Sequence, residues 1–238
     1  MELARMKVLA VGAHPDDLEI LCAGTLARFA QEGHRITMAH ACRGDKGHFE
    51  IPPDELARIR AEEARDSASV IGAESLGLGI DDLELRVERP NVMRFVDLIR
   101  KTMPDIIITH HPDDYMPDHT VTSRLVFDAS FIATLPHTKT RHRHCEKITP
   151  IYYMDTLAGV NFEPCEYVDI TDSMQTKLEM LKKHSSQIQW LKKHDKIDII
   201  EFVDTVARFR GLQSGTRYAE GFCRAHAWGR NTTKRYLP

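Results

Sequence analysis

The chain has 238 residues, a formal net charge of −3 at pH 7 and a sequence pI of about 6.5. This length suits one α/β domain with a sizeable core better than two domains, so we treat residues 1–238 as a single domain. The near-neutral charge gives no overall basic surface for nucleic acid, and no apolar run has the length of a membrane span, so a small molecule is the expected substrate.

The cysteine content and the N-terminal segment predict a cytoplasmic protein. The five cysteines are odd in number and contain no C-x-x-C pair, which favours reduced thiols and argues against a cysteine-based zinc site. The first residues run directly into a predicted strand, so cleavage of a signal peptide would destroy that strand.

The first predicted strand, residues 7–11, is a short apolar run that ends at Gly12, as expected for a strand buried in a parallel sheet. It is followed by proline and polar residues, namely His14, Pro15, Asp16 and Asp17. Pro15 fits the first turn of a helix predicted over residues 18–31, and the acidic residues suit the positive end of its dipole. The polar group therefore lies at the end of a strand where open α/β sheets bind ligands.

Strands and helices alternate along the rest of the chain. Short apolar or β-branched runs predict strands at residues 35–41, 74–80, 105–109, 151–154, 167–170 and 218–223. Helical spacing of apolar residues predicts helices over residues 54–71, 91–103, 121–133, 172–188 and 197–209. This order predicts a three-layer α/β sandwich with a mainly parallel sheet. The first turn has no G-x-G-x-x-G and its aspartates would repel a pyrophosphate, which argues against a dinucleotide site.

A second polar cluster, which includes His119, follows the predicted strand at residues 105–109. Parallel packing could bring it alongside His14 and Asp17, and two imidazoles with one carboxylate suit a catalytic zinc, ferrous iron or another divalent metal. Asp16 is our candidate for the base that takes a proton from a metal-activated water. The same residues also fit an ordinary capped helix with solvated histidines, so spacing alone leaves the metal site open.

Three segments carry family motifs: AHPDDLE at residues 13–19, IRAEEARDSASVIGA at residues 59–73 and PDIIITHHPDDYMPDHTVTSRLV at residues 104–126. Together they resemble the LmbE/PIG-L-like family of zinc-dependent N-deacetylases. The resemblance implies a Rossmann-like fold and removal of an N-acetyl group from an N-acetylglucosamine-type sugar or glycoconjugate. It implies that the zinc ligands are His14, Asp17 and His119 and that Asp16 is the general base. It also makes Arg60 a substrate-contacting arginine, with a helix-surface ion pair as the alternative.

The second motif departs from the family pattern. Many members have His-Pro-Asp-His, whose first histidine helps to stabilise the oxyanion, whereas this chain has Met116, Pro117, Asp118 and His119. A methionine side chain cannot donate a hydrogen bond, so His111 and Tyr115 are the candidate replacement donors, with His110 as a further one. Asp118 is expected to orient His119 from behind the metal.

Two other functions fit the same residues. Carboxylate and histidine sites also serve metal-dependent phosphoesterases, which often use two metals and several bridging aspartates. Met116 is also compatible with a binding module that keeps the metal and has lost turnover. A homo-oligomer is compatible with the sequence.

Overall fold

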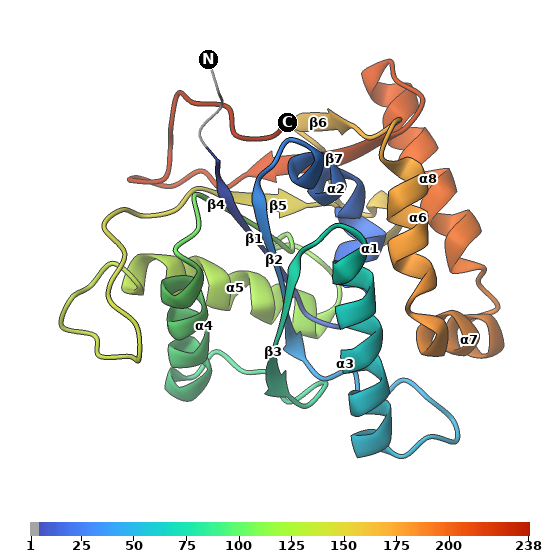
Figure 1. Cartoon of the computed structure of the whole chain (residues 1–238), viewed down its shortest axis with the longest axis horizontal. Coiled ribbons are helices and arrows are strands. Elements are labelled where there is room, and N and C mark those ends of the chain that lie inside the picture. The colour runs from blue at the N-terminus through green and yellow to red at the C-terminus, as the bar shows by residue number, and fades with distance from the viewer. Residues whose placement is uncertain (1–4) are drawn as a thin grey trace.

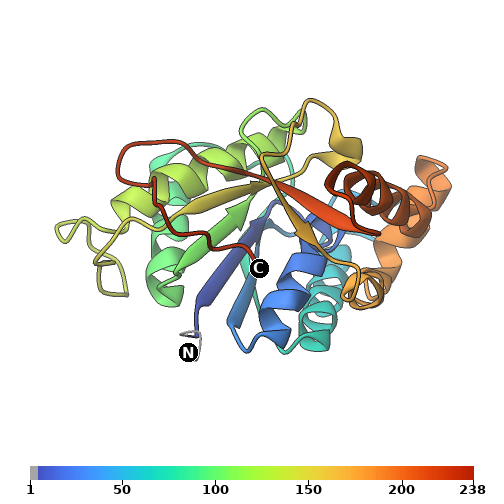
Figure 2. The same cartoon turned by 90° about the horizontal axis from the view of Figure 1, so that it is seen from above.

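The computed structural model describes residues 5–238 and contains a seven-stranded sheet between two layers of helices (Figure 1, Figure 2). The strands are β1 (Lys7–Gly12), β2 (Arg35–Cys42), β3 (Glu74–Ile80), β4 (Ile106–Thr109), β5 (Ile151–Met154), β6 (Glu166–Asp169) and β7 (Ala219–Arg224). Their order across the sheet is β3-β2-β1-β4-β5-β7-β6. The strands from β3 to β5 in that order pair in parallel, and β7 runs antiparallel to both of its neighbours. The predicted sandwich with a mainly parallel sheet is confirmed.

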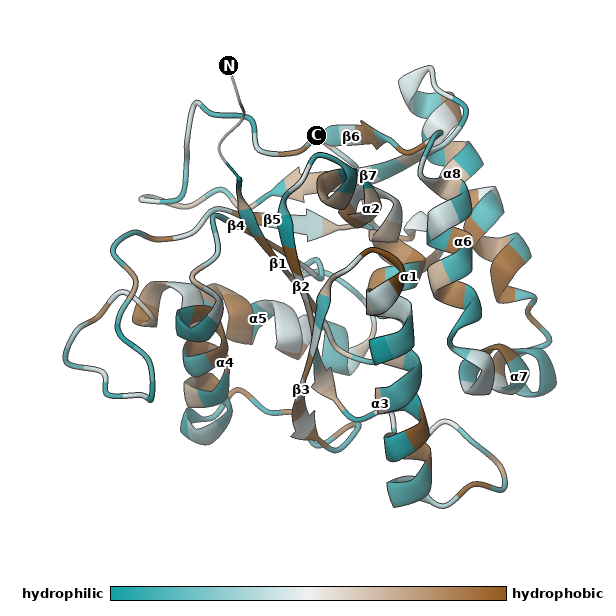
Figure 3. Cartoon of the chain, viewed as in Figure 1, coloured by the Kyte–Doolittle hydropathy of each residue, from teal (hydrophilic) through white to brown (hydrophobic). Residues whose placement is uncertain are grey.

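Helices cover both faces of the sheet. They are α1 (Asp17–Leu21), α2 (Ala23–Gln31), α3 (Pro53–Val70), α4 (Arg89–Thr102), α5 (Pro117–Ile132), α6 (Met174–Lys182), α7 (Ser185–His194) and α8 (Ile199–Ser214), with a short 3-10 helix η1 (Leu157–Gly159). Side chains alternate along β1, so Val8 and Ala10 pack with α1, α2, α6 and α8, whereas Leu9 and Val11 pack with α4 and α5. Figure 3 shows the hydrophobic colouring of β1 between these layers. Within residues 5–238, no helix is both long enough and apolar enough to cross a bilayer.

The first predicted helix is wrong as a single element, because the structure divides it into α1 and α2 at Cys22. Glu220, from β7, reaches this break and accepts hydrogen bonds from the backbone N–H groups of Gly24 at 3.0 Å and Thr25 at 2.7 Å. Lys177 forms a buried ion pair with the same carboxylate at 2.5 Å. A side chain from a distant strand therefore caps α2, which local sequence could not reveal.

Other helix boundaries also differ from the prediction, and α8 ends at Ser214, beyond the predicted end at residue 209. The helix predicted over residues 172–188 consists of α6 and α7, with His184 between them. Helix α5 begins at Pro117, earlier than predicted, because proline is well suited to the first helical turn. His119 therefore lies in the first turn of a helix, which fixes the direction of its side chain toward the end of β1.

Candidate active site

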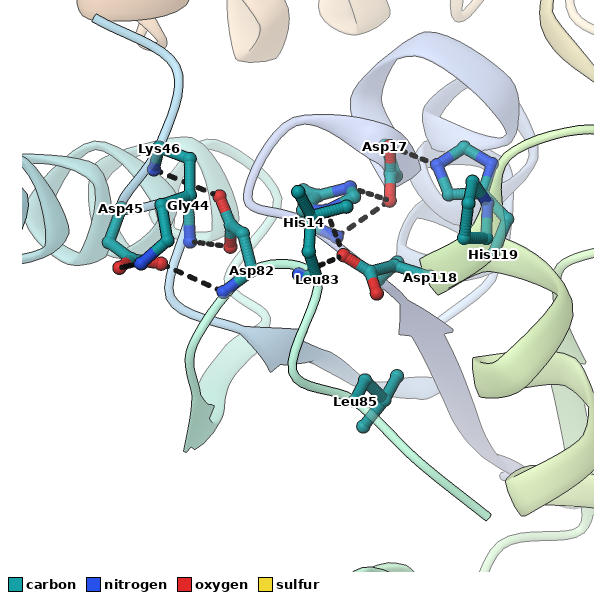
Figure 4. Close-up of polar contacts among 12 residues, drawn as sticks. His14, Asp17, Gly44, Asp45, Lys46, Asp82, Leu83, Leu85, Asp118 and His119 are labelled. Carbon is teal, nitrogen blue, oxygen red and sulfur yellow. Dashed lines mark hydrogen bonds and ion pairs between the residues drawn. The ribbon is translucent and has the colours of Figure 1, made fainter.

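The carboxyl ends of β1 and β4 bring the two polar clusters together. These strands are parallel neighbours with Val11 opposite Thr109, so the turns that follow them adjoin. The turn after β1 carries His14 and leads into α1, which begins at Asp17, and the turn after β4 leads into α5, which carries His119. The structure therefore gathers the three predicted metal ligands at one edge of the sheet, as Figure 4 shows.

Each of these three residues offers one ligand atom, and the three atoms lie within 4.8 Å of one another. His119 Nε2 lies 3.3 Å from Asp17 Oδ1, and His14 Nδ1 lies 3.6 Å from Asp17 Oδ2. Asp17 and His119 are buried, whereas the His14 side chain is 17% exposed. The cluster is therefore buried, and His14 is its most exposed member.

His119 and Asp17 are each supported by a neighbour that sequence reasoning did not place in this role. Asp114 Oδ2 lies 3.0 Å from His119 Nδ1, which leaves Nε2 to face Asp17. His110 Nε2 lies 3.1 Å from Asp17 Oδ2, and its ring stacks on that of His119 with centroids 3.8 Å apart. The available signal for Asp114 was an acidic residue shortly before a ligand histidine, since such histidines usually bond a carboxylate through their second nitrogen.

Asp118 supports His14 and not the expected His119. Its Oδ2 lies 3.1 Å from His14 Nε2 and accepts a hydrogen bond from the backbone N–H of Leu83 at 2.8 Å. The expected partner is unavailable because Asp114 already occupies the second ring nitrogen of His119. Figure 4 shows Asp118 between His14 and His119, with Leu83 approaching from the loop after β3. That loop therefore takes part in holding a predicted metal ligand.

Burial and charge act in opposite directions on the ionisable groups of the cluster. Burial lowers the pKa of His14, but hydrogen bonds with Asp118 and Asp17 raise it overall to about 10. Burial also lowers the pKa of His119, but neighbouring carboxylates raise it to about 9. Burial raises the pKa of Asp17, and the charge on His119 more than reverses this, holding it well below the usual value. Without a metal, protonated imidazoles therefore neutralise ionised carboxylates.

Asp16 lies next to the three predicted ligands and is held by Arg60. Its Oδ1 accepts a hydrogen bond from Arg60 Nη2 at 3.0 Å. Burial raises the pKa of Asp16 to about 6, although the charge on Arg60 opposes the rise. A carboxylate with such a pKa is mostly ionised near neutral pH and can still take up a proton, as a general base must.

Arg60 lies behind Asp16 and is only 3% exposed. Its guanidinium also donates hydrogen bonds to the backbone oxygens of Pro15 and Gly44. It is therefore not the helix-surface ion pair considered from the sequence. Its Nη1 and Nη2 groups bond protein oxygens, whereas its buried Nε has no hydrogen-bond partner among residues 5–238. Arg60 therefore links the loop after β1 to the loop after β2 through hydrogen bonds around Asp16.

The donor set fits a divalent metal such as zinc. Among the residues that the structure describes, none forms a hydrogen bond with His119 Nε2, although this nitrogen is buried and buried polar atoms usually have partners. A free imidazole nitrogen, a second imidazole and an ionised carboxylate are ligands that zinc commonly takes, and Fe²⁺ accepts the same set.

One known family matches the segment that carries both polar clusters. The family model PIG-L, described as GlcNAc-PI de-N-acetylase, matches residues 9–130 of this chain. The chain belongs to the PIG-L family. Among its relatives, the diacetylchitobiose deacetylase of Thermococcus kodakarensis is 30% identical over 230 residues, which cover 90% of this chain and 81% of the relative.

Other PIG-L-like proteins extend this comparison. The structure of the N,N'-diacetylchitobiose deacetylase of Pyrococcus horikoshii superposes with a TM-score of 0.81 at 28% identity, covering 93% of this chain and 84% of that one. The 4-oxalmesaconate hydratase of Pseudomonas putida is 25% identical over 227 residues, which cover 90% of this chain and 83% of the relative. Proteins with different named reactions are therefore similar to this PIG-L chain over most of its length.

Two candidate hydrogen-bond donors, His111 and Tyr115, are close in sequence to Met116, whose side chain offers no donor. The backbone N–H of Asp113 donates to His111 Nδ1 at 3.2 Å, so a neutral ring carries its proton on Nε2. Burial lowers the pKa of His111, which favours that neutral form with one N–H donor. Tyr115 is 53% exposed, and burial raises the pKa of its hydroxyl, which stays protonated and able to donate near neutral pH.

Metal affinity of this PIG-L protein should rise steeply with pH. The pKa values of His14, about 10, and His119, about 9, mean that a metal must displace a proton from each ring at neutral pH. We expect the apparent affinity to increase by up to about 100-fold per pH unit, as release of two protons requires. Chelator competition between about pH 6 and about pH 8 measures this slope, and calorimetry in buffers of different ionisation enthalpy counts the protons. Release of less than one proton per metal would contradict the proposed pair of ligands.

Proposed function

We propose that this PIG-L protein is a zinc-dependent N-deacetylase that removes the acetyl group from an N-acetylglucosamine-type sugar or glycoconjugate. The proposal is carried by one observation, the convergence of ligand atoms from His14, Asp17 and His119 beside the buried Asp16. The named activity of the diacetylchitobiose deacetylase relatives supports an N-acetylated amino sugar as the substrate class.

Amide hydrolysis requires a base for the attacking water and an acid for the leaving amine. Asp16 can take the water proton and return it to the amine, while Arg60 keeps its carboxylate oriented. His14, Asp17 and His119 would hold the metal, which when bound supplies Lewis acidity that polarises a carbonyl and lowers the pKa of water. Oxyanion stabilisation then falls to a donor other than residue 116, for which we propose His111 or Tyr115.

An assay of acetate release tests this proposal. The protein is purified, its metal content is measured, and it is incubated with N-acetylglucosamine, diacetylchitobiose and N-acetylglucosaminyl glycosides. We expect acetate and a free amine in equal amounts, with loss of activity after chelation and recovery on adding Zn²⁺. The same incubations with phosphate esters test the phosphoesterase alternative, which predicts phosphate release instead.

A second candidate is addition of water to a carbon–carbon double bond of a small unsaturated acid. The hydratase relative covers 90% of this chain, and Met116 removes the donor that many deacetylases place at this position. Loss of conjugated absorbance from unsaturated dicarboxylates, without acetate release from any amide, would favour this candidate. Bound metal with no turnover of either class, and no gain from Met116→His, would instead favour a binding module.

A further inference from the structure

A second set of potential metal ligands shares His14 with the candidate active site. His14, Cys42 and Asp82 each offer one ligand atom, and these atoms lie within 4.8 Å of one another. The three residues come from the ends of β1, β2 and β3, which are neighbouring parallel strands. Figure 4 shows Asp82 on the opposite side of His14 from Asp17. His14 therefore stands between two groups of ligands.

The backbone N–H of Cys42 donates a hydrogen bond to the carbonyl oxygen of Ala13 at 2.7 Å, which places Cys42 beside the turn that carries His14. The pairing of β2 with β3 shifts register between His40 and Cys42. Beyond the shift, Cys42 joins the same buried cluster as its neighbour Ala41, although adjacent residues in a regular strand point to opposite faces. The extra residue at this shift lies in β3, between Gly77 and Ile80, and the buried Cys42 thiol lies at the ends of β1 and β3.

Asp82 brings a buried carboxylate that bonds backbone N–H groups. It is 6% exposed and accepts hydrogen bonds from the backbone N–H groups of Gly44 at 2.7 Å and Lys46 at 3.2 Å. The Lys46 ammonium turns instead to Asp45, at 2.5 Å, and within residues 5–238 no lysine or arginine forms an ion pair with Asp82. A carboxylate that accepts hydrogen bonds only from backbone N–H groups keeps further lone pairs for a cation.

We propose that His14, Cys42 and Asp82 form a second metal site, for a thiophilic divalent cation such as Zn²⁺ or Cd²⁺. Sulfur, imidazole nitrogen and carboxylate oxygen together suit this class of cation better than Mg²⁺ or Ca²⁺. Coordination forms a bond between the metal and sulfur, and the thiol proton passes to solvent.

The second site would compete with the candidate active site, because both need His14 as a metal ligand. A neutral imidazole that carries one proton has a single nitrogen lone pair to give, so His14 serves one metal at a time. A cation bound with Cys42 and Asp82 therefore removes a ligand from the site that contains Asp17 and His119. Excess metal inhibits the enzyme by this route. The inhibition rests on the proposed function, whereas the binding of a cation by Cys42 does not.

Cadmium binding tests the second site directly, because a cadmium–thiolate bond has an ultraviolet charge-transfer band. The exposed Cys165 and the half-buried Cys223 have Sγ atoms 3.4 Å apart and could also bind cadmium. Every protein therefore carries Cys165→Ser and Cys223→Ser. Titration of this parent with Cd²⁺ should produce the band. Cys42→Ser should abolish it, and Cys145→Ser, at another buried cysteine, should leave it unchanged. A band of equal strength in the parent and in Cys42→Ser would overturn the proposal.

Asp82→Asn provides a variant that keeps the thiol. It should retain the band but require at least about tenfold more Cd²⁺ to reach it, the effect expected from loss of a metal partner. Circular dichroism verifies that each variant folds. If folded Asp82→Asn gave the same Cd²⁺ titration as the parent, Asp82 would be rejected as a ligand of the second site.

Acetate release measured against excess Zn²⁺ tests the competition. Cys42→Ser should require at least about tenfold more Zn²⁺ for half inhibition than the parent. Equal sensitivity of the two proteins would reject competition for His14. A Cys42-dependent band in a protein that releases no acetate would support the second site while contradicting the proposed deacetylase. Acetate release without such a band would support the proposed deacetylase and contradict the second site.

Discussion

Replacing Asp16 with asparagine is expected to lower kcat for acetate release by about 10²–10⁴-fold while the metal stays bound. The carboxylate is 7% exposed, and burial raises its pKa to about 6, which suits a group that accepts and returns a proton. Asparagine has nearly the same shape and can still accept the hydrogen bond from Arg60, but it cannot take up the proton. Steady-state kinetics should therefore show a large fall in kcat with little change in KM.

The Asp16→Asn protein should fold, because Asp16 has a φ of 122° and asparagine is among the residues that best tolerate positive φ. Metal analysis and circular dichroism establish that only the chemistry has changed. Asp17→Asn is the matched control, since it alters the adjacent carboxylate and should lose metal as well as activity. Full activity of Asp16→Asn on a substrate that the parent hydrolyses would reject Asp16 as the base.

Replacing His119 with alanine is expected to reduce bound zinc from about one equivalent to near zero and to abolish acetate release. The His119 ring is fully buried, and its Nε2 faces Asp17 without a hydrogen-bond partner among residues 5–238. Asp114→Ala should keep the ligand but leave its ring unheld, so zinc affinity should fall by about 10–100-fold. Elemental analysis after dialysis and chelator competition measure both effects.

His111→Ala is the control for metal loss, because His111 lies in the same turn and outside the three-residue ligand set. This variant should retain zinc whatever its effect on turnover. If His119→Ala still bound one equivalent of zinc with the affinity of the parent, the set of His14, Asp17 and His119 would be wrong. Equal metal loss in both variants would indicate that the turn had unfolded.

Strands were predictable because they are short apolar runs whose burial depends on the whole sheet having two covered faces. The strand predicted at residues 151–154 has those bounds as β5, and residues 74–80 form β3. Helix ends were less predictable, because distant residues decide them. Glu220 caps α2 from β7, and no local pattern in residues 18–31 indicates that interaction.

The proximity of His14, Asp17 and His119 could be predicted from sequence because these residues closely follow neighbouring strands and belong to family motifs. Their supporting contacts could not, since a carboxylate can turn toward either of two nearby histidines. Asp118 bonds His14 because Asp114 has already taken the Nδ1 of His119. Cys42 shows the same limit, because the absence of a C-x-x-C pair argued against a cysteine site, yet sheet packing brings this thiol to His14.

The way in which Leu83 contacts Asp118 leaves the amino acid at position 83 free to change. Leu83 reaches Asp118 through its backbone N–H, adopts a φ of 66° and leaves its side chain 57% exposed. Every amino acid except proline carries that N–H, and glycine or asparagine would also relieve the backbone strain. Evolution can therefore vary residue 83, and with it the surface offered to a substrate, while the support of His14 is inherited unchanged.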